Sequence, residues 1–287
     1  MAVYRAEELL ILAKTYPLPS EKHRETTCVA AVNRQGALRR IFPIPFRFLQ
    51  GDAKFDKWEW IRVQALKATG DNRPESYRVD TDTLKLLGQK IDTGKDRRWT
   101  ERRQWIEPHI VSNFTALEER RQTTEETLGI LRPTRLLGLD ITPVPKKDRD
   151  WSEEELRKLT QERLFDDTDV KARQMLKKVP FDFHYRYECA SARGTEANRH
   201  LITDWESSML YWNCVHSHGE RWEQPFRAKL ETEFAQKHMM FVMGTMHRFP
   251  SQWLIVGLIY PPKPSPPTPE PATAADPELA EQLSLGL

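Results

Sequence analysis

Four residues in the carboxyl-terminal third of the sequence are of the types that hold a divalent metal ion for phosphodiester hydrolysis. Asp204 and Glu206 supply carboxylate oxygens, and His200 and His247 supply imidazole nitrogens. Such groups are ligands for magnesium, manganese or zinc. The two carboxylates converge on one ion only if their segment is a strand, because side chains two residues apart on a helix diverge. The pattern predicts a metal-dependent nuclease as one function. The alternative is Thr203 or Asp204 as a helix cap, with Trp205 in the core.

The same region contains sulfur and nitrogen side chains of the types that bind zinc. No Cys-x-x-Cys pair is present, and the gap between Cys189 and His200 is not a standard zinc-finger spacing. A buried, unreactive Cys189 at the end of a strand is the alternative. The zinc candidates are Cys189, His200, Cys214, His216 and His218.

Positive and aromatic side chains are interleaved through residues 34–62, and a second basic stretch follows in residues 85–103. Arginine and lysine hold phosphates and aromatic rings stack on unpaired bases, so a nucleic-acid groove needs this mixture. An aromatic core with a basic exterior, or a solvated basic helix, produces a similar pattern. The nucleic-acid-binding candidates are Arg34, Arg39, Arg40, Arg47, Lys54, Lys57, Trp60, Arg97, Arg98, Arg102 and Arg103.

The last six residues are Gln-Leu-Ser-Leu-Gly-Leu, in which leucines alternate with small residues. An extended segment of this kind presents every second side chain to a groove. Residues 261–281 before it are rich in proline, alanine, threonine and acidic residues, which favours a flexible tether. This ending resembles the short motif by which bacterial replication and repair proteins dock into the hydrophobic cleft of the DNA polymerase sliding clamp.

The resemblance covers six of 287 residues and implies a role for each. The glutamine would be the polar anchor, the first two leucines the first apolar contacts and the final leucine the last. Gly286 departs from the proline or large residue often found at its position, so the bound shape is less preorganised. An end that packs on its own domain, or a helix over residues 277–285, is the alternative. The clamp-binding candidates are Gln282, Leu283, Ser284, Leu285 and Leu287.

The overall composition indicates a soluble globular protein of one or two domains. The formal net charge is +2, and residues after Tyr260 hold one lysine against four acids, which leaves +5 for the rest of the chain. Nine tryptophans and frequent arginine favour a surface that binds planar groups. Three cysteines are too few for a disulfide framework and favour a reducing cytoplasm. No 18-residue apolar run and no secretion leader are present, so no membrane contact is expected.

The order of the predicted elements favours an α+β fold. Short strands separated by turn residues over residues 24–80 predict a small curved sheet or barrel. Ser152 followed three residues later by Glu155 has the spacing of a helix capping box. Residues 238–246 and 253–260 are expected to form the core hairpin of a second unit. The expected parts are a mainly β nucleic-acid-contacting region in residues 1–110, a helical connector in residues 111–179, an α+β unit in residues 180–260 and a disordered, proline-rich tail in residues 261–287.

These patterns together predict a cytoplasmic bacterial or phage protein that binds DNA, and binding of protein or RNA by the body is a further alternative. It would act as an accessory to replication or repair, recruited by the sliding clamp, so that the clamp and DNA are its expected partners. The alternative is a metal-dependent nuclease of a mobile-element or phage-defence system, which would need a divalent metal as cofactor.

Overall fold

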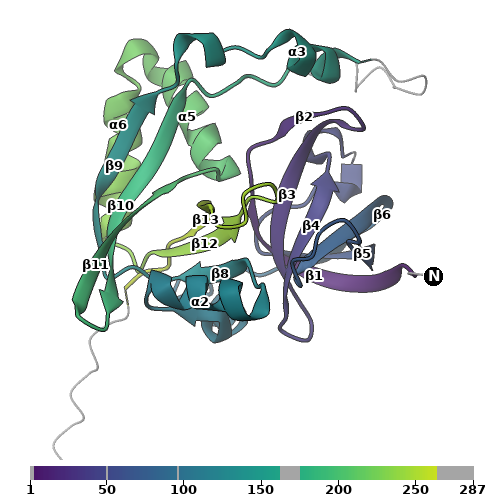
Figure 1. Ribbon diagram of the computed structural model, residues 1–287, viewed down its shortest axis with the longest axis horizontal. Helices are drawn as coiled ribbons and strands as arrows, with labels where there is room; N and C mark the ends of the chain where they lie inside the picture. Colours follow the sequence, from purple (N-terminus) through teal and green to yellow (C-terminus); the bar gives the residue numbers. More distant parts are fainter. Residues whose placement is uncertain (1–2, 50, 96, 162–174, 264–287) are drawn as a thin grey trace, which may run out of the picture.

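The computed structural model describes residues 3–49, 51–95, 97–161 and 175–263. In these ranges the protein has a mixed α+β fold built on three sheets (Figure 1). The predicted clamp-binding motif lies outside the described residues. Within them, every helix is too short or too polar to cross a membrane.

Five strands in the first 90 residues close into a barrel, which confirms the predicted N-terminal barrel (Figure 1). They are β1 (Arg5–Lys14), β3 (Arg24–Asn33), β4 (Leu38–Ile44), β5 (Glu59–Lys67) and β6 (Ser76–Lys90). The pairing runs β1-β3-β4-β6-β5 and returns to β1, and of these pairs β4 and β6 are parallel. When the five barrel strands are numbered 1 to 5 in chain order, the pairing order is 1-2-3-5-4-1. This is the topology of the OB-fold, a five-stranded Greek-key barrel.

β1 is buried on both of its faces. Leu9 and Ile11 point into the barrel and pack with its interior. Leu10 and Leu12 point outward and pack against a second sheet. A strand covered on both faces is apolar without interruption, which is why this segment lacks the alternation of a half-exposed strand.

The rest of the chain forms two further sheets and the helices that cover them. One sheet has the order β13-β12-β8-β7 and the other the order β11-β10-β9. Residues 111–179 hold helices α2 and α3 and also β8 and β9, which belong to these sheets. The elements are α1 (Thr100–Ile106), β7 (Ile110–Val111), α2 (Phe114–Thr124), β8 (Leu128–Leu131), β9 (Arg135–Pro143), α3 (Glu153–Thr160), β10 (Phe181–Ser191), β11 (Gly194–Leu201), α5 (Trp205–His218), α6 (Glu223–Arg227), the π-helical segment Ala228–Glu233, β12 (Met240–Thr245) and β13 (Trp253–Ile259).

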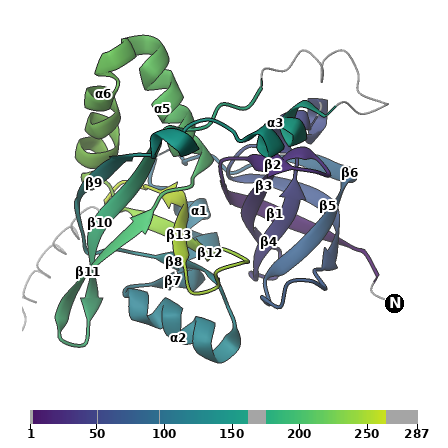
Figure 2. The ribbon, with the colours of Figure 1, turned by 45° about the horizontal axis from the view of Figure 1, so that its top comes forward.

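Local signals explain where several of these elements begin. The capping box predicted at α3 is present, because Ser152 accepts from the backbone of Glu155 and the Glu155 carboxylate accepts from the backbone of Ser152. The last two strands pair as an antiparallel hairpin, as the sequence predicts. α5 and α6 lie side by side against the three-stranded sheet (Figure 2).

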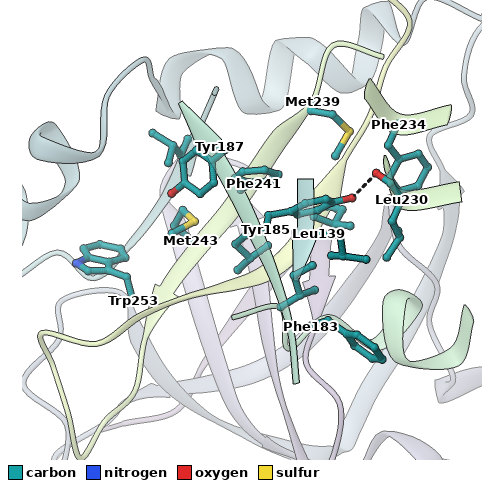
Figure 3. Close-up of a cluster of buried hydrophobic side chains, with 14 of the residues drawn as sticks. Leu139, Phe183, Tyr185, Tyr187, Leu230, Phe234, Met239, Phe241, Met243 and Trp253 are labelled. Carbon is teal, nitrogen blue, oxygen red and sulfur yellow. Dashed lines mark hydrogen bonds between the residues drawn. The ribbon is translucent and has the colours of Figure 1, made fainter. Parts of the chain in front are cut away.

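The four-stranded sheet separates two hydrophobic cores. Alternate residues of β12 face opposite ways: Met240 and Val242 face the barrel, and Phe241 and Met243 face the three-stranded sheet. Figure 3 shows the second core, in which buried aromatic rings of β10 pack on β12. There the hydroxyl of Tyr185 donates to the carbonyl of Leu230 at 2.8 Å, so its buried polar atom is satisfied (Figure 3).

A buried arginine ties the barrel to the four-stranded sheet. Arg40 of β4 is 4% exposed, and its guanidinium donates to Glu75 and to the backbone carbonyls of Thr127 and Thr245. Thr127 also donates to the Glu75 carboxylate. The ion pair is thus surrounded by hydrogen bonds that offset the cost of burying both charges.

The barrel and the four-stranded sheet approach each other closely at Gly257. A Cβ at this buried position of β13 would lie 2.3 Å from the Cβ of Ala13 in β1. Gly257→Ala is therefore expected to lower the free energy of unfolding by about 1–3 kcal/mol, because the barrel must shift away from the sheet. Urea unfolding followed by tryptophan fluorescence measures this change.

Gly70→Ala is the matched control. A Cβ at Gly70 meets nothing within 4 Å, so this variant is expected to change stability by about 0.5 kcal/mol or less. Equal stability of the two variants would contradict the close packing of β1 on β13.

Candidate nucleic-acid interface

The two carboxylates of the predicted metal site point to separate partners. Asp204 is the N-cap of α5, where its Oδ2 accepts from the backbone N–H and the hydroxyl of Ser207. Glu206 lies in the first turn of the same helix and forms an ion pair with Lys57 at 3.3 Å. This is the arrangement named above as the alternative, in which Asp204 starts a helix.

The two histidines of that set lie elsewhere. His200 is in β11 and forms a 2.8 Å hydrogen bond with the hydroxyl of Tyr187, and burial lowers its pKa to about 4. His247 lies in the β12–β13 loop beside the carbonyl of Gly70. Among the described residues no three His, Cys, Asp or Glu side chains are grouped closely enough to hold a metal ion. Cys189 and Cys214 of the zinc candidates are buried free thiols.

Most of the predicted basic residues of the barrel are paired within the chain. Arg34 stacks over the buried ring of Trp60, 3.6 Å from its centroid, and pairs with Glu8. Arg39 pairs with Glu7 at 3.1 Å. These contacts stabilise the barrel surface, and each arginine would have to give up a carboxylate to bind a phosphate.

The outer face of β3 and β4 explains part of this pairing. In OB-folds the second and third barrel strands carry the usual ligand face, and here these are β3 and β4. Ala30 and Val32 of β3 and Arg40 of β4 instead pack against the four-stranded sheet. That part of the usual face is therefore covered by the rest of the chain.

Three other candidates from the first region differ in their surroundings. Lys57 donates to the carbonyl of Leu258 as well as to Glu206. Arg47 pairs with Glu25 at 3.1 Å. Lys54 is exposed, with its ammonium 5.9 Å from the ring centroid of Phe46.

The second basic stretch divides into a buried and an exposed part. Arg102 is buried between the rings of Trp58 and Trp99 and donates twice to the carbonyl of Ile91. It holds α1 against the barrel. Arg97 and Arg98, which precede α1, are exposed, and Arg103 of α1 is half-buried. The surface side of α1 and of the turn before it therefore carries these three side chains.

A pocket of about 350 Å³ lies on that side, and we call it the α1 pocket. One face of α1, at the spacing i, i+3, i+4 and i+7, forms one wall, and the chain just after β13 forms the other. Arg103 joins the two walls, since it donates to the carbonyls of Arg98 and Pro262. The lining residues are Arg98, Thr100, Arg103, Gln104, Glu107, Pro262 and Lys263.

Three cations, Arg98, Arg103 and Lys263, line the α1 pocket together with the carboxylate of Glu107. Burial lowers the pKa of His238, which lies beside Arg103. The positive charges of Arg103, Arg132 and Lys263 add to this lowering, and Glu107 opposes it. Guanidinium, ammonium, hydroxyl and amide donors together suit a phosphate group.

The sequence matches two families of unknown function. Residues 5–108 match the family described as Domain of unknown function (DUF8758), and residues 111–279 match the one described as Domain of unknown function (DUF8757). The second match spans more than half of the 287 residues. The chain belongs to the DUF8757 family. No curated protein matches the sequence.

One solved structure with a weak likeness is a chain from a replication protein A heterotrimer bound to single-stranded DNA. The match covers 99% of this DUF8757 chain and 69% of the other, with 10% sequence identity and a TM-score of 0.22. A TM-score of this size does not indicate a common fold.

The α1 pocket draws residues from both matched segments of the DUF8757 chain. Arg98 and Arg103 lie in the first, and Pro262 and Lys263 lie in the second. Sequence reasoning identified the two arginines from their basic stretch and missed Lys263, which lies 160 residues away from Arg103. Its only sequence signal is that it is the first charge after the apolar run of β13.

Asp204 makes stability depend on pH. Burial raises its pKa to about 6, while the charge of Lys57 opposes the rise. The folded state therefore holds a proton that the unfolded chain releases near pH 4, so the free energy of unfolding falls as pH rises from about 4 to about 6. Asp204→Asn keeps an N-cap side chain and should remove this fall, measured by thermal unfolding at several pH values.

Glu118→Gln is the opposite control. The hydrogen bond from Arg121 lowers the pKa of Glu118 to about 2, so wild-type stability from this group is lost as pH falls through about 2. The glutamine variant should lack that acid-side loss and keep the fall between pH 4 and 6. An unchanged pH profile in Asp204→Asn would contradict the assignment of the fall to Asp204.

Proposed function

We propose that the protein binds single-stranded DNA through the α1 pocket and acts in the cytoplasm as an accessory to replication or repair. The observation that carries the proposal is the pocket itself, in which Arg98, Arg103 and Lys263 surround a space of about 350 Å³. A cationic pocket with hydrogen-bond donors favours a phosphate of the nucleic-acid backbone.

The surroundings of the α1 pocket favour single-stranded DNA over an isolated anion as its ligand. The exposed side chains of Arg97 and Arg132 extend the positive surface beyond the pocket. A row of cations matches a row of phosphates, whereas a single anion needs one site. The OB-fold topology of the barrel supports the proposal by analogy alone, since a fold hosts many functions.

The C-terminal motif supplies the proposed route to DNA. Gln282 follows Lys263 by 19 residues, so at full extension the two are at most about 70 Å apart. A clamp that holds Leu283 and Leu285 would thus keep the α1 pocket close to the DNA that the clamp encircles. The resulting high effective concentration lets the pocket's own affinity be modest.

Double substitution of the pocket cations tests the DNA-binding part. Arg98→Ala with Lys263→Ala is expected to weaken binding of a fluorescent single-stranded oligonucleotide. Loss of two phosphate contacts should also reduce the slope of log K against log salt by about 1.4. Fluorescence anisotropy across a salt series measures both quantities.

Lys146→Ala with Lys147→Ala is the matched control, because it removes the same charge from exposed positions between β9 and α3. It should leave the affinity within about twofold of wild type. Equal weakening in both double variants would mean that only net charge matters, and would contradict a site at α1.

The motif is tested with purified sliding clamp. Leu283→Ala with Leu285→Ala, and a chain ending at Glu281, are both expected to lose clamp binding in surface plasmon resonance while DNA binding in the absence of clamp stays unchanged. Retained clamp binding in both would show that the motif does not mediate docking.

A further inference from the structure

A second pocket lies beside the end of β13, and we call it the α5 pocket. It has a volume of about 300 Å³ and lies between α5, the π-helical segment and the end of β13. Leu210, Leu230 and Phe234 give it apolar walls, and Asn213 and Lys229 are among its polar lining residues. A mainly apolar space with a few placed polar groups is typical of a small-ligand site.

A buried carboxylate lines this pocket with one oxygen unused. Asp204 is 2% exposed, and both hydrogen bonds that it accepts from Ser207 reach Oδ2. Oδ1 has no hydrogen-bond partner in the described part of the chain. Asp204 lines the pocket, so a ligand that brings an N–H donor to Oδ1 gains a charge-assisted hydrogen bond.

The charges of the α5 pocket differ from those of the α1 pocket. Glu206 lines the α5 pocket and is held by Lys57, and Asp204 adds a second carboxylate. The only lining cation is Lys229, which also bonds to Glu233. Carboxylates beside apolar walls disfavour a phosphate and favour an uncharged planar ring that carries an N–H donor.

The two pockets are neighbours along the chain. Tyr260 lines the α5 pocket, and Pro262 and Lys263 line the α1 pocket. Only Pro261 lies between Tyr260 and Pro262, so their Cα atoms are at most about 7 Å apart. The ring of Tyr260 also stacks on Phe234 at 4.3 Å, which fixes an aromatic surface at the junction. The short stretch from Tyr260 to Lys263 therefore contributes to the lining of both pockets.

We propose that the α5 pocket binds a nucleobase with an exocyclic amino group, which donates to Oδ1 of Asp204 while the backbone phosphate lies in the α1 pocket. The inference rests on the proposed DNA-binding function and adds base preference to it. The base belongs either to the bound strand or to a free nucleotide, which share this chemistry. Such pockets read the edge of an unstacked base and pack on its ring.

Matched pyrimidine oligonucleotides test the proposal with the full chain at pH 8, where Asp204 is ionised. Cytosine carries an amino group where thymine carries a carbonyl, and the rings are otherwise of similar size. Wild type is expected to bind oligo(dC) about 3- to 10-fold more tightly than oligo(dT), the effect of one net hydrogen bond. Competition with CMP and UMP distinguishes a base of the bound oligonucleotide from the base of a free nucleotide. If CMP displaces the oligonucleotide more readily than UMP does, the pocket is assigned to free nucleotides.

Asp204→Asn is the decisive variant. The amide oxygen can still accept from Ser207 and cap α5, and the NH₂ group then replaces the acceptor in the pocket. The preference for oligo(dC) should disappear or reverse, while the salt slope stays unchanged. Asn213→Trp, which adds a ring at an exposed lining position, is the second variant and should remove the preference without touching the N-cap.

The outcomes separate the two proposals. Equal binding of oligo(dC) and oligo(dT) by wild type, or a preference that survives both variants, overturns the base pocket and leaves the α1 pocket standing. Absence of salt-dependent binding to any oligonucleotide overturns the proposed function itself. A preference that both variants abolish supports the base pocket.

Discussion

The fold depends on one constraint, which is that β1 must be covered on both faces. Leu9 and Ile11 fill the barrel, and Leu10 and Leu12 require a second sheet on the outside. The four-stranded sheet supplies it, and the absence of a side chain at Gly257 allows the strands to approach. Burying this apolar face provides the main driving force that holds the barrel to the rest of the chain.

This packing decides where a ligand can bind. The four-stranded sheet covers part of the outer face of β3 and β4. Arg40 is buried there and binds Glu75 and the carbonyl of Thr245, so it does not reach a ligand. Arg102 is likewise fixed between tryptophan rings. Exposed positive charge is left at the surface of α1, beside the chain that leaves β13, and both pockets lie at this junction. The proposed site is therefore at the edge of the barrel.

Sequence patterns predicted the local elements and only part of the site. The α+β class, the barrel and the capping box at Ser152 follow from short-range signals, which is why they could be read directly. The parallel pairing that closes the barrel joins distant strands and leaves no local signal. The basic residues were found by type, but whether Arg34 binds Trp60 or a phosphate depends on tertiary contacts. Lys263 joins the pocket only because the chain returns to α1.

Photo-crosslinking locates the bound strand most directly. A single-stranded oligonucleotide that carries 5-bromodeoxyuridine would be irradiated with the full chain, and the linked peptides identified by mass spectrometry. Binding at the junction predicts crosslinks to residues 98–107 and 258–263, which salt suppresses as it weakens binding. Crosslinks confined to other parts of the barrel, such as the exposed strand β6, would contradict a nucleic-acid site at α1.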